Sequence, residues 1–353
     1  MTLIHAFEGL RMFTHSLRVR LRGFQQYNGT AEDICRAIVK DCWNGKYFQT
    51  STGHFTQFWT RDFGWCVASL LRLGYRDQAI KTLQYALQSF TKAGKITTAI
   101  TPGGRAFDFP TRAVDTLPWL VFALAQVQNA ALTASYAPLI RSQLQELMSW
   151  LDHGLVKNNL RLSSIKDHAR RAPCCYDTCM LGMLSTQLTR LALQNPLKHY
   201  SYRQLLEHHF WTGKGYRDHK GSKEHSGDAN LFAVWTGLAP KTHNTQVLRI
   251  LETLSQPFPL KYTLEQETHE TINAARLAPN YQGNTIWAHL GMIYLDYLRR
   301  EHTKQYTTVK KQYAALIETH KTFLELYAPD GKPFKSPLYI TDEGMLWASL
   351  YLA

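Results

Sequence analysis

The sequence predicts an all-α protein, an (α/α)6 barrel built from six helical hairpins. Two observations favour this fold class. Apolar segments with helical periodicity recur 51 to 62 residues apart, and an amphipathic helix lies between each pair of them. Alternating strand patterns are sparse, which disfavours an α/β barrel. We expect one barrel domain over residues 1–353, in which residues 1–29 form a basic N-terminal helical segment.

The six apolar segments share one design, in which an acidic residue or an asparagine stands at the start of a helix-period run. Such a side chain caps or charges the amino end of a helix. Because the runs are apolar nearly all round, we expect these helices to be buried on every side as an inner ring. The landmark residues are Asp62, Asp115, Asp177, Asp228, Asn284 and Glu343.

The six amphipathic helices between these segments each have one polar face, which is typical of an outer ring. A closed ring is favoured over an open solenoid, since a solenoid buries only one face of each helix. In a ring the inner N-termini converge at one end, so the landmark residues should line a shared funnel. The outer helices are expected at residues 31–41, 76–90, 137–151, 201–210, 245–254 and 303–326.

Composition and charge exclude several classes of protein. The 353 residues are 44% hydrophobic and 19% charged, which supports a folded core and argues against disorder. No apolar run reaches the roughly 18–20 residues that span a bilayer, so we expect no membrane partner. The formal net charge of +13 invites a nucleic-acid hypothesis. We disfavour it, because the basic residues are spread along the chain and no nucleic-acid-binding motif accompanies them.

The six cysteines do not predict a disulfide framework in a chain of this length. Cys174, Cys175 and Cys179 cluster, but the second pair typical of a zinc site is missing. We therefore expect reduced, buried thiols and a cytoplasmic location. The N-terminus lacks the apolar core and cleavage site of a secretory signal, and an arginine-rich transit peptide is the alternative. We expect no metal and no cofactor. The oligomeric state is left open.

The segment FWTRDFGW, residues 58–65, combines aromatic rings with an Arg-Asp pair at a helix start. This pattern suits a sugar subsite, in which rings stack on a pyranose and Arg61 and Asp62 bind hydroxyl groups. The alternative is that Asp62 only caps its helix. The same alternative applies to Asp115, Asp228 and Asn284.

Two further carboxyl groups lie where a funnel mouth would need them. Asp167 stands in an irregular basic loop, LRLSSIKDHARRAPCCYD, before the third apolar segment. Glu325 is expected at the end of the outer helix 303–326, where the negative helix terminus disfavours a carboxylate. That conflict suggests a purpose other than stability. The neighbouring Arg170 and Arg171 are expected to point outward.

The order of WTRDFGW, AVDTLPWLVFAL, SSIKDH, SGDANLFAVW, YQGNTIWAHLGMIYL and ELYAPDGKPF resembles the six-hairpin glycosidases. The resemblance covers residues about 30–353. It is nearest to the group that contains glucosidase domains of glycogen-debranching enzymes, neutral invertases and trehalase-like or processing α-glucosidases. The resemblance implies an amylo-α-1,6-glucosidase-like carbohydrate hydrolase with an α/α toroid.

The resemblance also implies roles for individual residues. Asp167 matches the family's general acid, and Glu325 in ELYAPDGKP matches its general base. One departure is His168, where the family usually has glycine or arginine after the acid. This departure leaves Asp177 as an alternative acid. The positions that match sugar-contacting stretches are Trp59, Arg61, Asp62, Tyr281, Asn284 and Trp287.

We therefore expect an inverting glycoside hydrolase that acts on an α-linked glucoside or a similar small saccharide. Inversion needs an acid that protonates the leaving oxygen and a base that activates water, about 6.5–9.5 Å apart. The alternatives are a β-fructofuranosidase of the invertase type and a non-catalytic carbohydrate-binding or helical scaffold protein. Asp115, Asp177 and Asp228 are expected to contribute to substrate binding through their places in the repeat.

Overall fold

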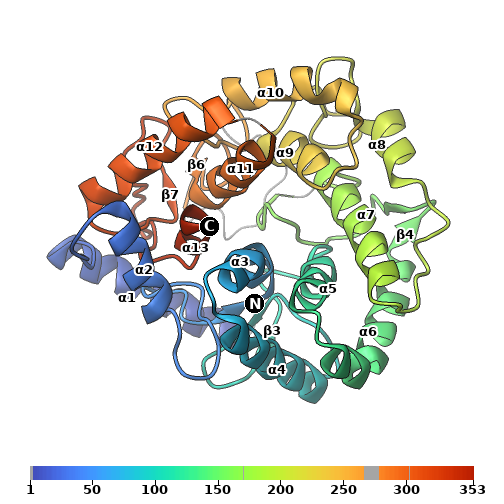
Figure 1. Cartoon of the computed structure of the whole chain (residues 1–353), viewed down its shortest axis with the longest axis horizontal. Helices are drawn as coiled ribbons and strands as arrows, with labels where there is room; N and C mark the ends of the chain where they lie inside the picture. The colour runs from blue at the N-terminus through green and yellow to red at the C-terminus, as the bar shows by residue number, and fades with distance from the viewer. Residues whose placement is uncertain (1–2, 170, 266–277, 302) are drawn as a thin grey trace.

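The computed structural model describes residues 3–169, 171–265, 278–301 and 303–353. A ring of inner helices surrounds the centre of the molecule (Figure 1). Each inner helix contacts the next, and the last contacts the first, so the ring is closed. The inner helices are α3 (Thr60–Arg72), α5 (Thr116–Val127), α7 (Cys175–Arg190), α9 (Gly227–Trp235), α11 (Ala288–Glu301) and α13 (Ala348–Leu352).

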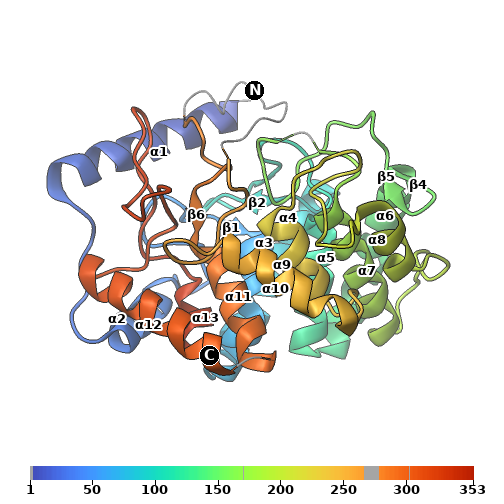
Figure 2. The ribbon, with the colours of Figure 1, turned by 90° about the horizontal axis from the view of Figure 1, so that it is seen from above.

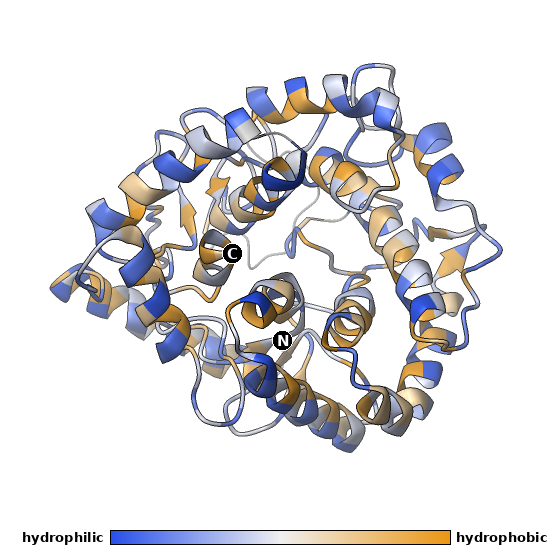
Figure 3. Cartoon of the chain, in the orientation of Figure 1, coloured by the Kyte–Doolittle hydropathy of each residue, from blue (hydrophilic) through white to orange (hydrophobic). Residues whose placement is uncertain are grey.

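A second ring of helices packs around the first, and each outer helix contacts an inner one. Polar residues colour much of the outer ring in Figure 3, as amphipathic helices require. The outer helices are α2 (Ala31–Asp41), α4 (Arg76–Ala93), α6 (Ala130–Ser149), α8 (Tyr202–Phe210), α10 (Asn244–Thr253) and α12 (Thr303–His320). The predicted (α/α)6 barrel is confirmed. Within the described ranges, no helix has the length and hydrophobicity to cross a membrane.

Four landmark residues begin inner helices as predicted. Asp62, Asp177 and Asp228 lie in the first turns of α3, α7 and α9, and Asp115 is the N-cap residue of α5. All four are buried.

The other two landmark residues precede their helices. Asn284 lies before α11 because the intervening residues form strand β6 (Ile286–Trp287), which pairs with β7 (Leu326–Tyr327). Glu343 lies before α13 because the chain turns at Gly344, where φ is +62°. The expectation that Glu343 is a first-turn acid of the last inner helix is wrong. Its carboxylate instead accepts a hydrogen bond from the backbone N–H of Gln25.

Short strands stiffen the loops at one end of the barrel (Figure 2). Strand β1 (Phe58–Trp59) pairs antiparallel with β2 (Ala99–Ile100), which pairs with β3 (Ala106–Phe107). Strands β4 (Leu151–Asp152) and β5 (Leu155–Val156) form a separate hairpin. Because β1 leads directly into α3 and β6 into α11, these pairings fix the residues at the N-termini of both inner helices.

The outer helix α12 ends at His320, before the predicted boundary. Lys321 has a φ of +55°, which ends the helical path. Glu325 therefore does not lie at a helix end, and that expectation is wrong. It stands beside strand β7, where its N–H donates to Asp342 O and its C=O accepts from Ala288 N.

Helix α1 (Leu3–Arg22) lies across the end of the barrel that carries the strands (Figure 2). The predicted helical segment is present, and the face that it packs on the barrel mixes polar residues with the apolar Met12 and Val19. Glu8, His15 and Ser16 are buried against the barrel, whereas Phe7 and Leu21 are 68% and 75% exposed. Polar contacts therefore contribute much of the packing of this helix, because several of its apolar side chains point to solvent.

All six cysteines are free and buried, as predicted. Burial raises the pKa of the Cys174 and Cys175 thiols well above the ordinary value. These thiols are therefore packing residues of α7 and its N-cap rather than reactive groups.

Candidate functional site

A cavity of about 320 Å³ lies at the end of the barrel where the inner helices begin. Helix α1 contributes to its wall through His5, Gly9, Met12 and Phe13. The remaining wall comes from the starts of inner helices and from the loops that lead into them. The sequence-predicted residues that line it are Trp59, Arg61, Asp62, Asp167, Tyr281, Trp287 and Glu325.

Arg61 joins two of the predicted carboxyl groups. Its guanidinium donates to Asp115 through Nε at 2.6 Å and Nη2 at 3.2 Å, which is a bidentate pair. Its Nη1 donates to Asp167 Oδ1 at 3.2 Å, and Nη2 also reaches the carbonyl of Ser164 at 2.6 Å. Asp115 is fully buried, so it fixes the direction of Arg61 from behind while Asp167 faces the cavity.

The surroundings of Asp167 raise the pKa of its carboxyl group above the ordinary value for an aspartate. Burial raises its pKa to about 6, although the nearby Arg61 works in the opposite direction. The negative charge of Asp115 also raises this pKa, because it offsets the charge of Arg61. The loop that carries Asp167 is irregular, as predicted, and Ser163 Oγ donates to its Oδ1 at 3.3 Å.

Glu325 reaches the cavity from the opposite half of the chain and is 1% exposed. Tyr281 donates its hydroxyl proton to Oε1 at 2.5 Å. The Tyr339 hydroxyl and the backbone N–H of Asp342 both donate to Oε2, the latter at 3.0 Å. Burial raises the pKa of Glu325, whereas these hydrogen bonds lower it by stabilising the carboxylate.

Asp62 is a third carboxyl group on the cavity wall. Trp347 donates from Nε1 to its Oδ1 at 3.0 Å. Burial raises its pKa to about 7, and Arg61 works against that shift. Asp62 therefore combines a fixed orientation with a carboxyl group that keeps its proton to a higher pH than an ordinary aspartate does.

Aromatic rings form much of the remaining wall. Tyr281 and Trp287 meet edge to face with ring centroids 4.8 Å apart, and His168 stacks on Tyr281 at 5.6 Å. On the other side, Trp59 packs edge to face against Phe109 at 5.9 Å. Such surfaces suit the apolar faces of sugar rings, with carboxylates and Arg61 left to bind hydroxyl groups.

Four of the predicted site residues do not line the cavity. Asp115 pairs with Arg61 below the surface, and Asp177 accepts a hydrogen bond from Ser164 Oγ at 2.6 Å. Burial raises the pKa of Asp177 to about 7, but its position is behind the wall. The remaining two are Asp228, which pairs with Arg171, and Asn284, which accepts a hydrogen bond from Asn280.

The predicted outward orientation of Arg171 is wrong. Its side chain is buried, and Nη1 contacts both Asp218 and Asp228, the latter at 2.9 Å. Two buried carboxylates draw the guanidinium inward, and their charges offset the cost of burying it. Arg170 lies outside the described residues.

Several lining residues were not predicted as functional. Tyr339 and His168 lie beside the two central carboxyl groups, and Trp65, His289 and Trp347 form part of the floor. His168 directly follows Asp167, so its position next to a predicted site residue could have identified it. The role of Tyr339 depends on folding, since nothing in SPLYITDEG links it to Glu325.

No protein-family model matches this chain, and no curated protein matches it in sequence. Its fold, however, is similar to those of solved carbohydrate-active enzymes. A rhamnosidase from Klebsiella oxytoca with rhamnose bound shares 15% identity at a TM-score of 0.65, covering 91% of this chain and 62% of that one. A mannosylglycerate hydrolase from Thermus thermophilus, in complex with Tris and D-glycerate, shares 11% identity at 0.63, covering 91% and 98%.

A bacterial glucoamylase complexed with acarbose is similar at a TM-score of 0.62 and 10% identity, covering 95% of this chain and 55% of that one. This chain thus spans less than two thirds of the rhamnosidase and the glucoamylase, but nearly all of the mannosylglycerate hydrolase. At these identities the likeness is one of fold. The chain has the (α/α)6 barrel fold found in these glycosidases.

Proposed function

We propose that this protein is an inverting glycoside hydrolase in which Asp167 is the general acid and Glu325 the general base. One observation carries the proposal. The two carboxyl groups, far apart in the sequence, line the same cavity at the end of the barrel where the inner helices begin. An inverting reaction needs this arrangement, with water activated on the face of the sugar opposite the leaving group.

Asp167 suits the acid because its surroundings favour the protonated form. With its pKa raised to about 6, it holds its proton in mildly acidic solution and gives it up more readily than an alcohol does. The Arg61–Asp115 pair positions this carboxyl group without contributing a full positive charge. Asp177, the alternative acid, is separated from the cavity by the wall residues.

Glu325 suits the base because its carboxylate is held by three donors. Oε2 accepts two hydrogen bonds and Oε1 accepts one. A carboxylate oxygen has two lone pairs, so Oε1 retains one with which to accept a proton from water. The two tyrosines also prevent the side chain from rotating away.

The cavity is small, at the lower end of the roughly 300–1,000 Å³ typical of ligand pockets. We therefore propose a small saccharide with an α-linked glucosyl unit as substrate. It would enter the cavity from one end, because α1 covers part of the mouth. Trp59, Tyr281 and Trp287 provide stacking surfaces, and Arg61 and Asp62 bind hydroxyl groups. Similar structures in complex with glucose and with acarbose support this substrate class.

We also propose a cytoplasmic location. Its reducing conditions keep cysteines as thiols, and all six cysteines are free and buried. The proposal also includes a single barrel domain. The mechanism as proposed uses only protein carboxyl groups for the transfer of protons.

The test is the hydrolysis of a panel of glucosides, trehalose, sucrose and glycerate-linked sugars by the purified full chain and four variants, the fourth being Asp177→Asn. Glu325→Gln is expected to abolish turnover of every substrate. Asp167→Asn is expected to abolish turnover of natural glycosides, but to retain turnover of aryl glycosides whose leaving groups need no proton. Asp152→Asn is the control, because this aspartate is exposed on a distant hairpin.

Other outcomes would select the alternatives. Cleavage of sucrose alone would indicate a β-fructofuranosidase of the invertase type. Saccharide binding without turnover of any substrate would indicate a non-catalytic carbohydrate-binding protein. Undiminished turnover by Asp167→Asn with natural substrates, and its loss in Asp177→Asn, would transfer the role of acid to Asp177.

A further inference from the structure

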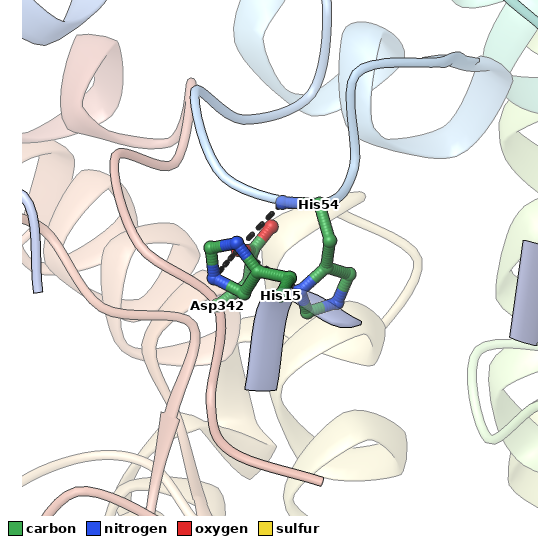
Figure 4. Close-up of side chains that lie close together, drawn as sticks. All are labelled: His15, His54 and Asp342. Atoms are coloured by element: carbon green, nitrogen blue, oxygen red, sulfur yellow. Dashed lines mark hydrogen bonds and ion pairs between the residues drawn. The ribbon is translucent and has the colours of Figure 1, made fainter. Parts of the chain in front are cut away.

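A buried cluster of two histidines and one aspartate lies beside the cavity (Figure 4). His15 comes from α1, His54 from the loop before β1, and Asp342 from the segment before α13. Asp342 Oδ1 is 3.3 Å from His15 Nε2 and 3.1 Å from His54 Nδ1. All three side chains are at least nine-tenths buried, and neither of these nitrogens makes a hydrogen bond.

If His54 is neutral, its Nδ1 carries no proton. Tyr339 has a single hydroxyl proton, which it donates to Glu325 Oε2. The Tyr339 oxygen also lies 3.2 Å from His54 Nε2, so a neutral His54 carries its proton on Nε2 and donates it there. Its Nδ1 lone pair then faces the carboxylate oxygen of Asp342 at 3.1 Å. Two buried lone pairs at this distance repel unless a proton or a metal ion lies between them.

Three donor atoms that converge in this way have the spacing of metal ligands. Zinc bonds of about 2.0–2.1 Å in a tetrahedral arrangement place neighbouring ligand atoms about 3.3 Å apart. The two distances to Asp342 Oδ1 agree with this spacing, and all three ligand atoms lie within 4.8 Å of one another. Two imidazoles and one carboxylate are a donor set that divalent transition metals prefer.

The surroundings of Asp342 hold its carboxylate in place. Ser51 Oγ and the Phe55 N–H donate to Oδ2, and the His54 N–H donates to Oδ1 at 3.0 Å. The loop presses so closely that a Cβ added at Gly53 would lie 1.9 Å from Oδ1. Such support for a ligating carboxylate is typical of metal sites.

We propose that His15 Nε2, His54 Nδ1 and Asp342 Oδ1 form a site for a divalent transition metal, with zinc the best fit and solvent completing its coordination. Glu343 Oε1, 3.8 Å from His15 Nε2, adds negative charge nearby. Arg18 Nη2 donates to His15 Nδ1 at 3.4 Å, and a metal on Nε2 would break this hydrogen bond by placing the imidazole proton on Nδ1. Arg18 then retains only its ion pair with Glu343.

The metal would fasten α1 over the cavity. This helix packs in part through polar residues, and its His15 would become one of three ligands joining it to two loops of the barrel. The site also contacts the proposed base indirectly, since His54 and Glu325 share Tyr339. The metal proposal does not depend on the catalytic one, because its test measures binding.

The test uses the full chain without a histidine tag, freed of metal by a chelator and titrated with Zn²⁺ and separately with Co²⁺. We expect one equivalent of Zn²⁺ to bind, a rise in Tm, and the visible absorption of tetrahedral Co²⁺. His15→Gln should weaken Zn²⁺ binding more than about tenfold, since even loss of a group behind a ligand costs 10–100-fold. His208→Gln/His209→Gln, on the outer helix α8, should leave binding unchanged.

Failure of the wild-type chain to take up an equivalent of either metal would overturn the proposal, and a protonated His54 would then supply the cation. Equal Zn²⁺ binding by wild type, His15→Gln and His54→Gln would also overturn it, by placing the metal elsewhere. The wild-type titration decides the matter even if a variant does not fold, which circular dichroism would reveal.

Discussion

Replacing Tyr339 by phenylalanine removes one hydroxyl group and tests how Glu325 is kept ionised. In the wild type this hydroxyl donates to Glu325 Oε2, and the hydrogen bond lowers a pKa that burial raises. The substitution keeps the ring, which contacts Tyr281, Phe334 and His54. The loss is therefore confined to the hydroxyl group, which donates to Glu325 and lies 3.2 Å from His54 Nε2.

The expected magnitude follows from the energy of that hydrogen bond. A hydrogen bond to a charged group contributes about 1.5–3 kcal/mol, and 1.36 kcal/mol corresponds to one pH unit of titration. Tyr281 and the Asp342 N–H continue to donate, so the lower end of the range applies. Without the Tyr339 donor the pKa of Glu325 rises. Because a base must be deprotonated, the acidic limb of activity should move to higher pH by about one unit.

The assay is the pH dependence of kcat/KM for the wild type, Tyr339→Phe and the control Tyr85→Phe. Tyr85 donates its hydroxyl proton to Thr101 O, away from Glu325. We expect the control to follow the wild-type profile. An acidic limb in Tyr339→Phe that stays in place, or moves to lower pH, would refute the view that Tyr339 stabilises an ionised base.

Three further predictions concern buried charge. The alkaline limb of kcat/KM should fall as the pH rises through about 6, since Asp167 must be protonated to act and its pKa is about 6; a rate that continues to rise to pH 8 would contradict this role. Asp115→Asn should lower the free energy of unfolding by about 3–5 kcal/mol in urea denaturation, because Arg61 loses its bidentate partner; a loss below 1 kcal/mol would show that Asp167 and Ser164 suffice for Arg61. Arg171→Met should lower the free energy of unfolding by a similar amount, because Asp218 and Asp228 remain buried without their guanidinium partner. The control Arg112→Met, at an exposed ion pair, should lower it by only about 0–1 kcal/mol. Equal losses of stability in the two variants would contradict the importance of burial.

The barrel was predictable because its signal is periodic and repeated. An acidic residue before an apolar helical run recurs at Asp62, Asp115, Asp177 and Asp228, and each stands at the start of an inner helix. Burial on all sides follows from the lack of a polar face. The boundaries of α12 and α13 were less predictable, since a positive φ at Lys321 and a turn at Gly344 leave little trace in the hydrophobic pattern.

The cavity could be predicted only in part. Arg61, Asp62, Asp167 and Glu325 line one cavity at one end of the ring, although Glu325 was expected at a helix end. The sequence did not show which side chains form ion pairs with residues far away along the chain. Arg171 was expected to point outward because an inward arginine would oppose protonation of Asp167, but Asp218 and Asp228 draw it into the protein.

Helix α1 shows the same limit. It was predicted only as a basic helical segment, and the sequence did not show that Glu8, His15 and Ser16 would be buried against the barrel. The cluster of His15, His54 and Asp342 draws on residues separated by as many as 327 positions, so no local motif announces it.

The most direct measurement of the central claim is the anomer of the sugar released in the first turnovers, followed by proton NMR before mutarotation. If Glu325 activates water across the ring from Asp167, an α-linked glucoside must yield β-glucose first. Release of α-glucose first would mean retention, and would contradict an acid and a base separated by a water molecule.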